Sequence, residues 1–132
     1  MMVFVDTSAL FALVNGAEAN HPRSSEVWRS LVAGPAMLLT SNYILLETCS
    51  LLQNRLGVEA VRAFEEKAVP LMHVEWIDEE RHRMAMGMVL TAGRRKLSLV
   101  DCVSFQVMRA LGVRAVFCFD DHFREQGFEV MP

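Results

Sequence analysis

The feature that most constrains this chain is the alternation of short apolar runs with longer helical patterns. The main apolar runs lie at residues 2–5, 36–39, 71–77 and 114–119, and a short strand-like segment follows at 128–130. Continuous apolar runs predict strands that are buried on both faces, as in a parallel sheet. The helical patterns between them predict helices that cover both faces. We therefore predict an α/β fold in three α/β/α layers, around a mostly parallel sheet of four to five strands.

Breaker and capping residues delimit the predicted helices. Asn15-Gly16, Gly34-Pro35, Gly57, Gly93 and Gly112 each follow a segment with helical spacing. The segments expected to be helical are 7–14, 21–33, 41–56, 58–68, 78–91, 98–111 and a short stretch from 121. Nothing along the chain reads as a linker or an internal repeat, so 132 residues form one expected domain, 1–132.

Composition restricts the class of protein. The hydrophobic share is 52% and the charged share 22%, which excludes a disordered chain. A formal net charge of −3 provides no global basic field, so a polyanionic partner would need a local basic patch or bound metal ions. Three cysteines are an odd count that suits a reducing compartment. With neither a basic secretory leader nor a stretch long enough to span a membrane, we expect a soluble cytoplasmic protein.

Carboxylates stand where the predicted strands end. Asp6 follows the first strand, Asp120 follows the fourth, Asp101 lies early in the helix from Ser98, and Glu47 interrupts an apolar helix. Ligand sites of open parallel sheets lie at the carboxyl ends of the strands, so the four should converge there. Close carboxylates repel one another and raise their pKa values, and a divalent cation relieves this. Hard oxygen ligands suit Mg²⁺ or Mn²⁺, which predicts metal-dependent phosphodiester hydrolysis by metal-activated water.

Each carboxylate also has a structural interpretation. Asp6 and Asp120-Asp121 suit helix caps or turns, and Ser98 with Asp101 makes a capping box. Glu47 is equally compatible with a solvated helix face. Taken one at a time, these residues leave a shared metal site and ordinary capping both open.

Four segments together resemble the PIN-domain family, in particular its VapC-type toxin ribonucleases. The segments are Val3-Phe4-Val5-Asp6-Thr7-Ser8-Ala9-Leu10, Thr40-Ser41-Asn42-Tyr43-Ile44-Leu45-Leu46-Glu47, Leu97-Ser98-Leu99-Val100-Asp101 and Cys118-Phe119-Asp120-Asp121-His122-Phe123. The resemblance extends from residue 2 to about residue 130. It implies a PIN-like fold, Mg²⁺ or Mn²⁺ as cofactor, and endonucleolytic cleavage of RNA to products with a 5′-phosphate and a 3′-hydroxyl.

The resemblance also assigns roles to individual residues. Asp6, Glu47, Asp101 and Asp120 match the family's acidic quartet, with Asp6 and Asp101 as the principal metal ligands. Thr7 and Ser98 match its supporting hydroxyl positions. The chain departs from the pattern at Cys118, where the family usually has Thr or Ser, which puts the support of Asp120 in doubt and leaves Asp121 as its neighbouring alternative.

Partners follow from the same resemblance. It implies an RNA substrate, a small antitoxin protein and a homodimer. The basic run Arg94-Arg95-Lys96 precedes the Asp101 helix and is predicted to contact RNA phosphates, with a solvated loop as the alternative. Arg124 is a weaker candidate for this contact, and His122 has little expected role.

Other functions remain open at this point. A processing nuclease outside any toxin–antitoxin pair would carry the same residues. A phospho-aspartyl enzyme would need a second acid close to Asp6, where the chain has Thr7-Ser8. In a non-catalytic α/β interaction module the carboxylates would only cap helices.

Overall fold

The centre of the molecule is a five-stranded sheet in which every neighbouring pair is parallel. The computed structural model describes all residues, 1–132. The strands are β1 (Met2–Val5), β2 (Met37–Ser41), β3 (His73–Glu75), β4 (Ala115–Phe117) and β5 (Glu129–Met131). Their order is β3-β2-β1-β4-β5, which places β1 in the middle and the chain's last strand at one edge.

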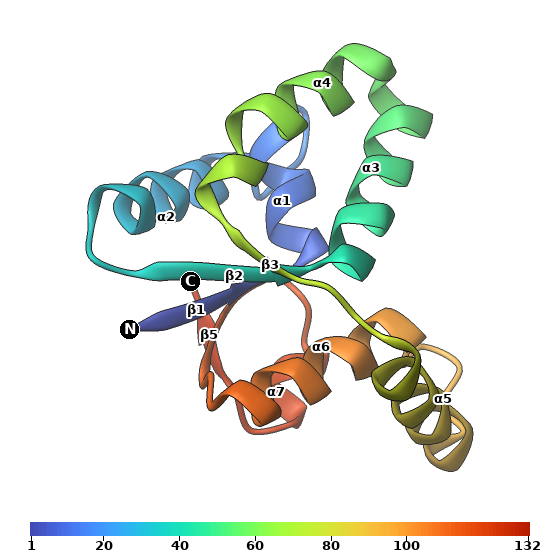
Figure 1. The fold of residues 1–132 in the computed structure, drawn as a ribbon. Coiled ribbons are helices and arrows are strands. Elements are labelled where there is room, and N and C mark those ends of the chain that lie inside the picture. Colours follow the sequence, from blue (N-terminus) through green and yellow to red (C-terminus); the bar gives the residue numbers. More distant parts are fainter.

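Helices cover both faces of the sheet (Figure 1). One layer contains α1 (Thr7–Val14), α2 (His21–Ala33), α3 (Asn42–Leu56) and α4 (Val58–Lys67). The other contains α5 (Glu79–Ala92), α6 (Leu99–Leu111) and the short α7 (His122–Glu125). The predicted three-layer α/β/α fold with a parallel sheet is therefore confirmed.

Burial explains why β1 and β4 carry no polar residues. Val3, Phe4 and Val5 of β1 are fully buried, as are Val116 and Phe117 of β4. They belong to one cluster of 27 buried hydrophobic residues that lies on both sides of the sheet. Phe105 and Phe123 meet edge to face in this cluster, with ring centroids 5.1 Å apart, and so attach α7 to α6.

Side-chain caps define where the helices begin. Ser41 accepts a hydrogen bond from the Ile44 amide at the start of α3, and Asp78 accepts one from the Arg81 amide at the start of α5. Helix α6 ends at Gly112, whose φ of 69° lies in the left-handed region that favours glycine. None of the helices combines the length and the apolar character needed to cross a membrane.

Two strands are shorter than the sequence predicted, and β2 is displaced. The run 71–77 contributes only His73–Glu75, because a 3₁₀ turn at Val69–Leu71, with Pro70 in its first positions, takes up the preceding residues. The run 114–119 contributes Ala115–Phe117. Strand β2 continues to Ser41 rather than ending at 39, and the Thr40 hydroxyl donates to the Val5 carbonyl across the sheet.

Candidate active site

Asp6 lies directly after β1, at the carboxyl edge of the sheet, and caps α1. Its Oδ2 accepts hydrogen bonds from the Ser8 amide at 3.1 Å and the Ser8 hydroxyl at 2.7 Å. The Ser8 Oγ in turn accepts from the Phe119 amide at 2.9 Å, which ties the loop after β4 to this carboxylate. The capping interpretation of Asp6 is thus correct, and the same side chain lies beside two further carboxylates.

Asp101 is fixed by the predicted capping box. The Ser98 hydroxyl accepts from the Asp101 amide at 3.0 Å, and Asp101 Oδ2 accepts from the Ser98 amide at 3.2 Å. The Asp101 side chain is almost fully buried, with 8% of the residue exposed. Asp101 therefore both caps α6 and belongs to the acidic site, because the capping box holds its carboxylate beside the other acids.

Asp120 lies three residues beyond the end of β4 and joins Asp101 through His122. Asp120 Oδ1 accepts from the His122 amide at 2.8 Å. The His122 Nδ1 lies 3.0 Å from Asp101 Oδ2 and 3.4 Å from Asp120 Oδ1. Each of the three residues offers one potential metal-ligating atom, and these atoms lie within 4.8 Å of one another.

Sequence reasoning underrated His122 and did not single out Ser8. The available signal for His122 was its place two residues after a strand-end carboxylate, where the turn brings its ring back to the acidic edge. Both neighbours of Nδ1 are carboxylate oxygens, which only accept hydrogen bonds, so Nδ1 carries a proton. His122 is therefore a positioning residue for two of the three clustered acids.

Burial and charge together act on the Asp6 carboxyl. The pKa of Asp6 is raised from 3.8 to about 7: removal from water is the main cause, the hydrogen bonds from Ser8 oppose the rise, and the charges of Asp101 and Asp120 add to it. Near neutral pH the Asp6 carboxyl is therefore partly protonated and partly ionised. The structure therefore brings Asp6, Asp101 and Asp120 together, as the strand-end pattern implied.

Glu47 is placed differently. It lies in the second turn of α3, is half-buried, and makes no hydrogen bond or ion pair within the chain. Its neighbour Thr48 donates to the Thr7 hydroxyl at 3.4 Å, which joins α3 to the start of α1. Glu47 is thus near the helix junction but outside the hydrogen-bonded acidic cluster, and its catalytic role remains a prediction.

Cys118 binds the backbone of the loop after β4 and not the carboxylate of Asp120. Its Sγ donates to the Asp120 backbone carbonyl at 3.6 Å, and burial raises the thiol pKa to about 12, so the thiol stays neutral. The Asp120 carboxylate takes its hydrogen bond from the His122 amide instead. Asp121 is exposed and lies 3.8 Å from Arg124.

The basic run Arg94-Arg95-Lys96 lies in the loop that connects α5 to α6 and is exposed. Arg94 is partly engaged, since its guanidinium forms an ion pair with Glu125 of α7 at 3.1 Å. Arg95 and Lys96 make no ion pair. The loop therefore lies beside α7 with two free cations, and its contact with RNA phosphates remains a prediction.

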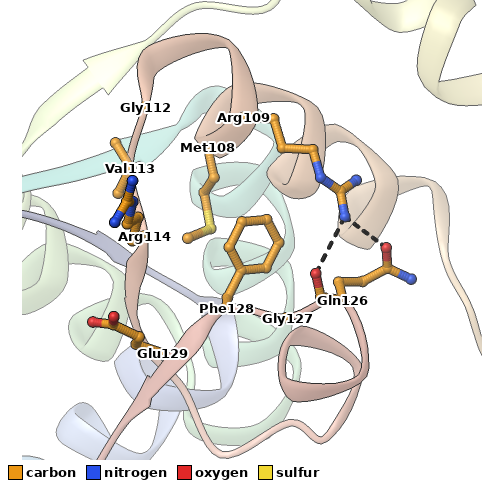
Figure 2. Close-up of a pocket in the computed structure, with 9 residues that line it drawn as sticks. All are labelled: Met108, Arg109, Gly112, Val113, Arg114, Gln126, Gly127, Phe128 and Glu129. Atoms are coloured by element: carbon orange, nitrogen blue, oxygen red, sulfur yellow. Dashed lines mark hydrogen bonds between the residues drawn. The ribbon is translucent and has the colours of Figure 1, made fainter.

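A cavity of about 490 Å³ lies at the opposite edge of the sheet, where β4 and β5 begin (Figure 2). Two of the polar residues that line it bind each other, since Arg109 donates to the backbone and side-chain oxygens of Gln126. Glu129 is its only carboxylate. A metal site is therefore expected at the carboxyl edge of the sheet, where several carboxylates lie together, and not in this cavity.

Comparison with known proteins identifies the fold family. Residues 3–129 match the PIN domain. The chain belongs to the PIN-domain family. This PIN domain is 36% identical over 133 residues to the 23S rRNA-specific endonuclease VapC20 of Mycobacterium tuberculosis, and the match covers 99% of both chains. The resemblance predicted from the four segments is thereby confirmed.

Solved structures agree with this assignment. The crystal structure of VapC20, described as a sarcin–ricin loop cleaving toxin, superposes with a TM-score of 0.87 at 35% identity, over 98% of this PIN domain and 99% of that chain. VapBC2 of Rickettsia felis, bound to a promoter DNA fragment, gives a TM-score of 0.70 at 9% identity over 98% of this chain and 97% of that one. FitAcB of Neisseria gonorrhoeae gives a TM-score of 0.68 at 16% identity, over 100% of this chain and 97% of that one. The last two show the fold alone.

Proposed function

We propose that this PIN domain is a divalent-metal-dependent endoribonuclease, and that it is the toxin of a toxin–antitoxin pair. The observation that carries the proposal is a buried Asp6 beside Asp101 and Asp120, three carboxylates with one protonated imidazole nitrogen among them. Such a grouping is costly for folding unless a cation compensates it, which is typical of a functional site.

The donor set fits Mg²⁺ or Mn²⁺. Carboxylate oxygens are the ligands that these hard cations prefer, and Asp6 has a free oxygen besides the one that Ser8 occupies. Asp6 and Asp101 would hold the ion, with Asp120 and Glu47 completing the site directly or through water. When bound, the ion supplies a nucleophilic water near neutral pH and neutralises charge on the phosphate.

The chain's own residues orient the carboxylates. Ser8 holds Asp6 Oδ2, and the Ser98 amide holds Asp101 Oδ2. His122 keeps its proton on Nδ1, between Asp101 and Asp120, and so limits their mutual repulsion. Thr7 and Thr48 fix α3 against α1, which sets the position from which Glu47 can reach the site. Preorganised carboxylates of this kind need little rearrangement during the reaction.

The substrate class follows from the relative. VapC20 is named for 23S rRNA and for the sarcin–ricin loop, and the identity of 36% extends over the whole of both chains. We infer a structured loop of large-subunit ribosomal RNA as the substrate here. That substrate would place the reaction in the cytoplasm.

The partner is inferred from the relative, because VapC20 is a toxin. A small antitoxin that covers the acidic edge would hold the nuclease inactive, and a homodimer is part of the same proposal. A processing nuclease outside a toxin–antitoxin pair is the alternative, and a short gene for a DNA-binding antitoxin beside this one would favour the toxin.

The decisive experiment maps cleavage sites in total RNA with and without Mg²⁺. The wild type should cut at a discrete site and leave a 5′-phosphate, whereas a chelator, Asp6→Asn or Asp101→Asn should abolish cutting. Glu47→Gln tests the fourth acid in the same assay.

The matched control is Asp78→Asn, because Asp78 caps α5 as Asp6 caps α1 but lies outside the cluster. It should cut like the wild type. Unchanged cutting by Asp6→Asn, or a cyclic phosphate at the new end, would refute the mechanism. A wild type that binds neither Mg²⁺ nor Mn²⁺ would favour a non-catalytic interaction module.

A further inference from the structure

A second feature of the carboxyl edge is a hollow of about 180 Å³ on the β5 side of the acidic cluster. It lies between the first turn of α2, the loop after β4 and the helix α7. Two arginines, Arg23 and Arg124, line it together with Phe119 and Asp120. Asp120 thus belongs both to this hollow and to the acidic cluster, so the two sites share a wall.

Arg23 is held in place without being neutralised. Its guanidinium lies over the Phe119 ring, 5.9 Å from the centroid, and makes no ion pair or hydrogen bond within the chain. The Phe119 amide donates to Ser8, which binds the Asp6 carboxylate. The position of Arg23 is therefore coupled through two hydrogen bonds to the candidate metal ligand, while all its N–H donors stay available.

Arg124 is available as well. Its contact with Asp121 spans 3.8 Å between side chains that are 66% and 91% exposed. Ion pairs this exposed contribute little and exchange readily for a stronger anion. By contrast, Arg94 of the loop before α6 is paired with Glu125 at 3.1 Å.

We propose that Arg23 and Arg124 form a phosphate-binding subsite that holds the RNA backbone next to the bond being cut. This inference rests on the proposed nuclease function. With the scissile phosphate at the acidic cluster, a neighbouring phosphate of the same strand reaches the hollow through the shared Asp120 wall. Guanidinium groups bind phosphate oxygens in a bidentate manner, and Phe119 preorganises one of them. Both arginines position the substrate and take no part in the chemical step.

The test measures cleavage and binding of an RNA hairpin with the sarcin–ricin loop sequence, in the presence of Mg²⁺. Arg23→Gln should raise KM about tenfold, the loss expected for one charge-assisted contact, and leave kcat within about twofold. On the cleavage-deficient Asp101→Asn background it should weaken binding and reduce the slope of log K against log salt by about 0.7. Arg124→Gln should act in the same direction, and Arg23→Lys should restore part of the binding.

The matched control is Arg55→Gln. Arg55 also lies over a phenylalanine ring, that of Phe11 at 5.4 Å, and makes no ion pair, but it stands in the last turn of α3. It should leave KM and the salt slope unchanged. A purely structural role of Arg23 would instead lower thermal stability and leave the salt slope intact.

The outcomes separate this inference from the proposed function. If the wild type cleaves the hairpin, and Arg23→Gln and Arg124→Gln have the same KM and salt slope as Arg55→Gln, the subsite alone is overturned. If the wild type binds the hairpin without cleaving it, and Arg23→Gln weakens this binding, the nuclease proposal is overturned and the subsite is kept. A wild type that does not bind the hairpin would overturn both.

Discussion

At the scale of single residues, the same side chains build the fold and the site. Asp6 caps α1 and Asp101 closes the capping box of α6, yet the charge of Asp101 also acts on the Asp6 carboxyl and raises its pKa. A carboxylate that only capped a helix would stay in water. Burial of Asp6 to 4% exposure beside two further acids is therefore a cost that capping does not explain.

Asp6→Asn should stabilise the metal-free protein in a pH-dependent way. The folded pKa of about 7 lies above the ordinary value of 3.8, so folding favours the protonated form. The penalty is absent below about pH 4, grows as the pH rises toward 7 and is complete above it. At pH 8 the variant should gain up to about 4 kcal/mol in the free energy of unfolding, and at pH 4 almost nothing.

Urea unfolding in excess chelator at the two pH values measures this difference. Asp78→Asn, at an exposed cap, should show no such gain. Equal stability of the Asp6→Asn variant and the wild type at pH 8 would mean that Asp6 is not buried as a charge.

At the scale of elements, caps and glycines fix where helices begin, and the beginnings carry the site. The N-cap of α1 is Asp6, the first turn of α6 contains Asp101, and the turn before α7 and its first residue supply Asp120 and His122. Apolar patterning could predict these elements because burial of a continuous run imposes a strand. It could not predict the shortened β3 and β4, whose ends are set by a 3₁₀ turn and by loop hydrogen bonds.

Ser98→Ala should lower both stability and activity, because it removes half of the capping box that orients Asp101. Loss of such a cap costs about 1 kcal/mol. Asp78→Ala removes the cap of α5 and should cost a similar amount while leaving cleavage intact.

Thermal unfolding and RNA cleavage by both variants, measured in parallel, separate the two effects. If both variants lost cleavage equally, activity would follow overall stability rather than the orientation of Asp101.

At the scale of the whole molecule, the parallel sheet gathers residues that are far apart in the chain. Positions 6, 101 and 120 meet because β1 and β4 end at one edge of the sheet and α6 begins beside it. The three carboxylates repel one another at this edge, so a cation that binds them should stabilise the entire fold.

Mg²⁺ or Mn²⁺ should therefore raise the Tm of the wild type, and more at pH 8 than at pH 6. Asp6 must lose its proton to bind a cation, and its pKa of about 7 places that loss between the two values. Differential scanning calorimetry across a metal titration measures the shift. Asp101→Asn should abolish it, and an equal shift in that variant would place the ion elsewhere.

The sequence by itself determined the fold class, the helix limits and the strand-end positions of Asp6 and Asp120, because local patterning and capping are short-range effects. Only the tertiary structure decided that His122 bridges two carboxylates, that Ser8 links Asp6 to Phe119, and that Glu47 makes no hydrogen bond to any of them. Those contacts depend on how the loop after β4 turns and on how α3 packs against α1. They join residues up to 111 positions apart, a distance at which no local pattern carries information.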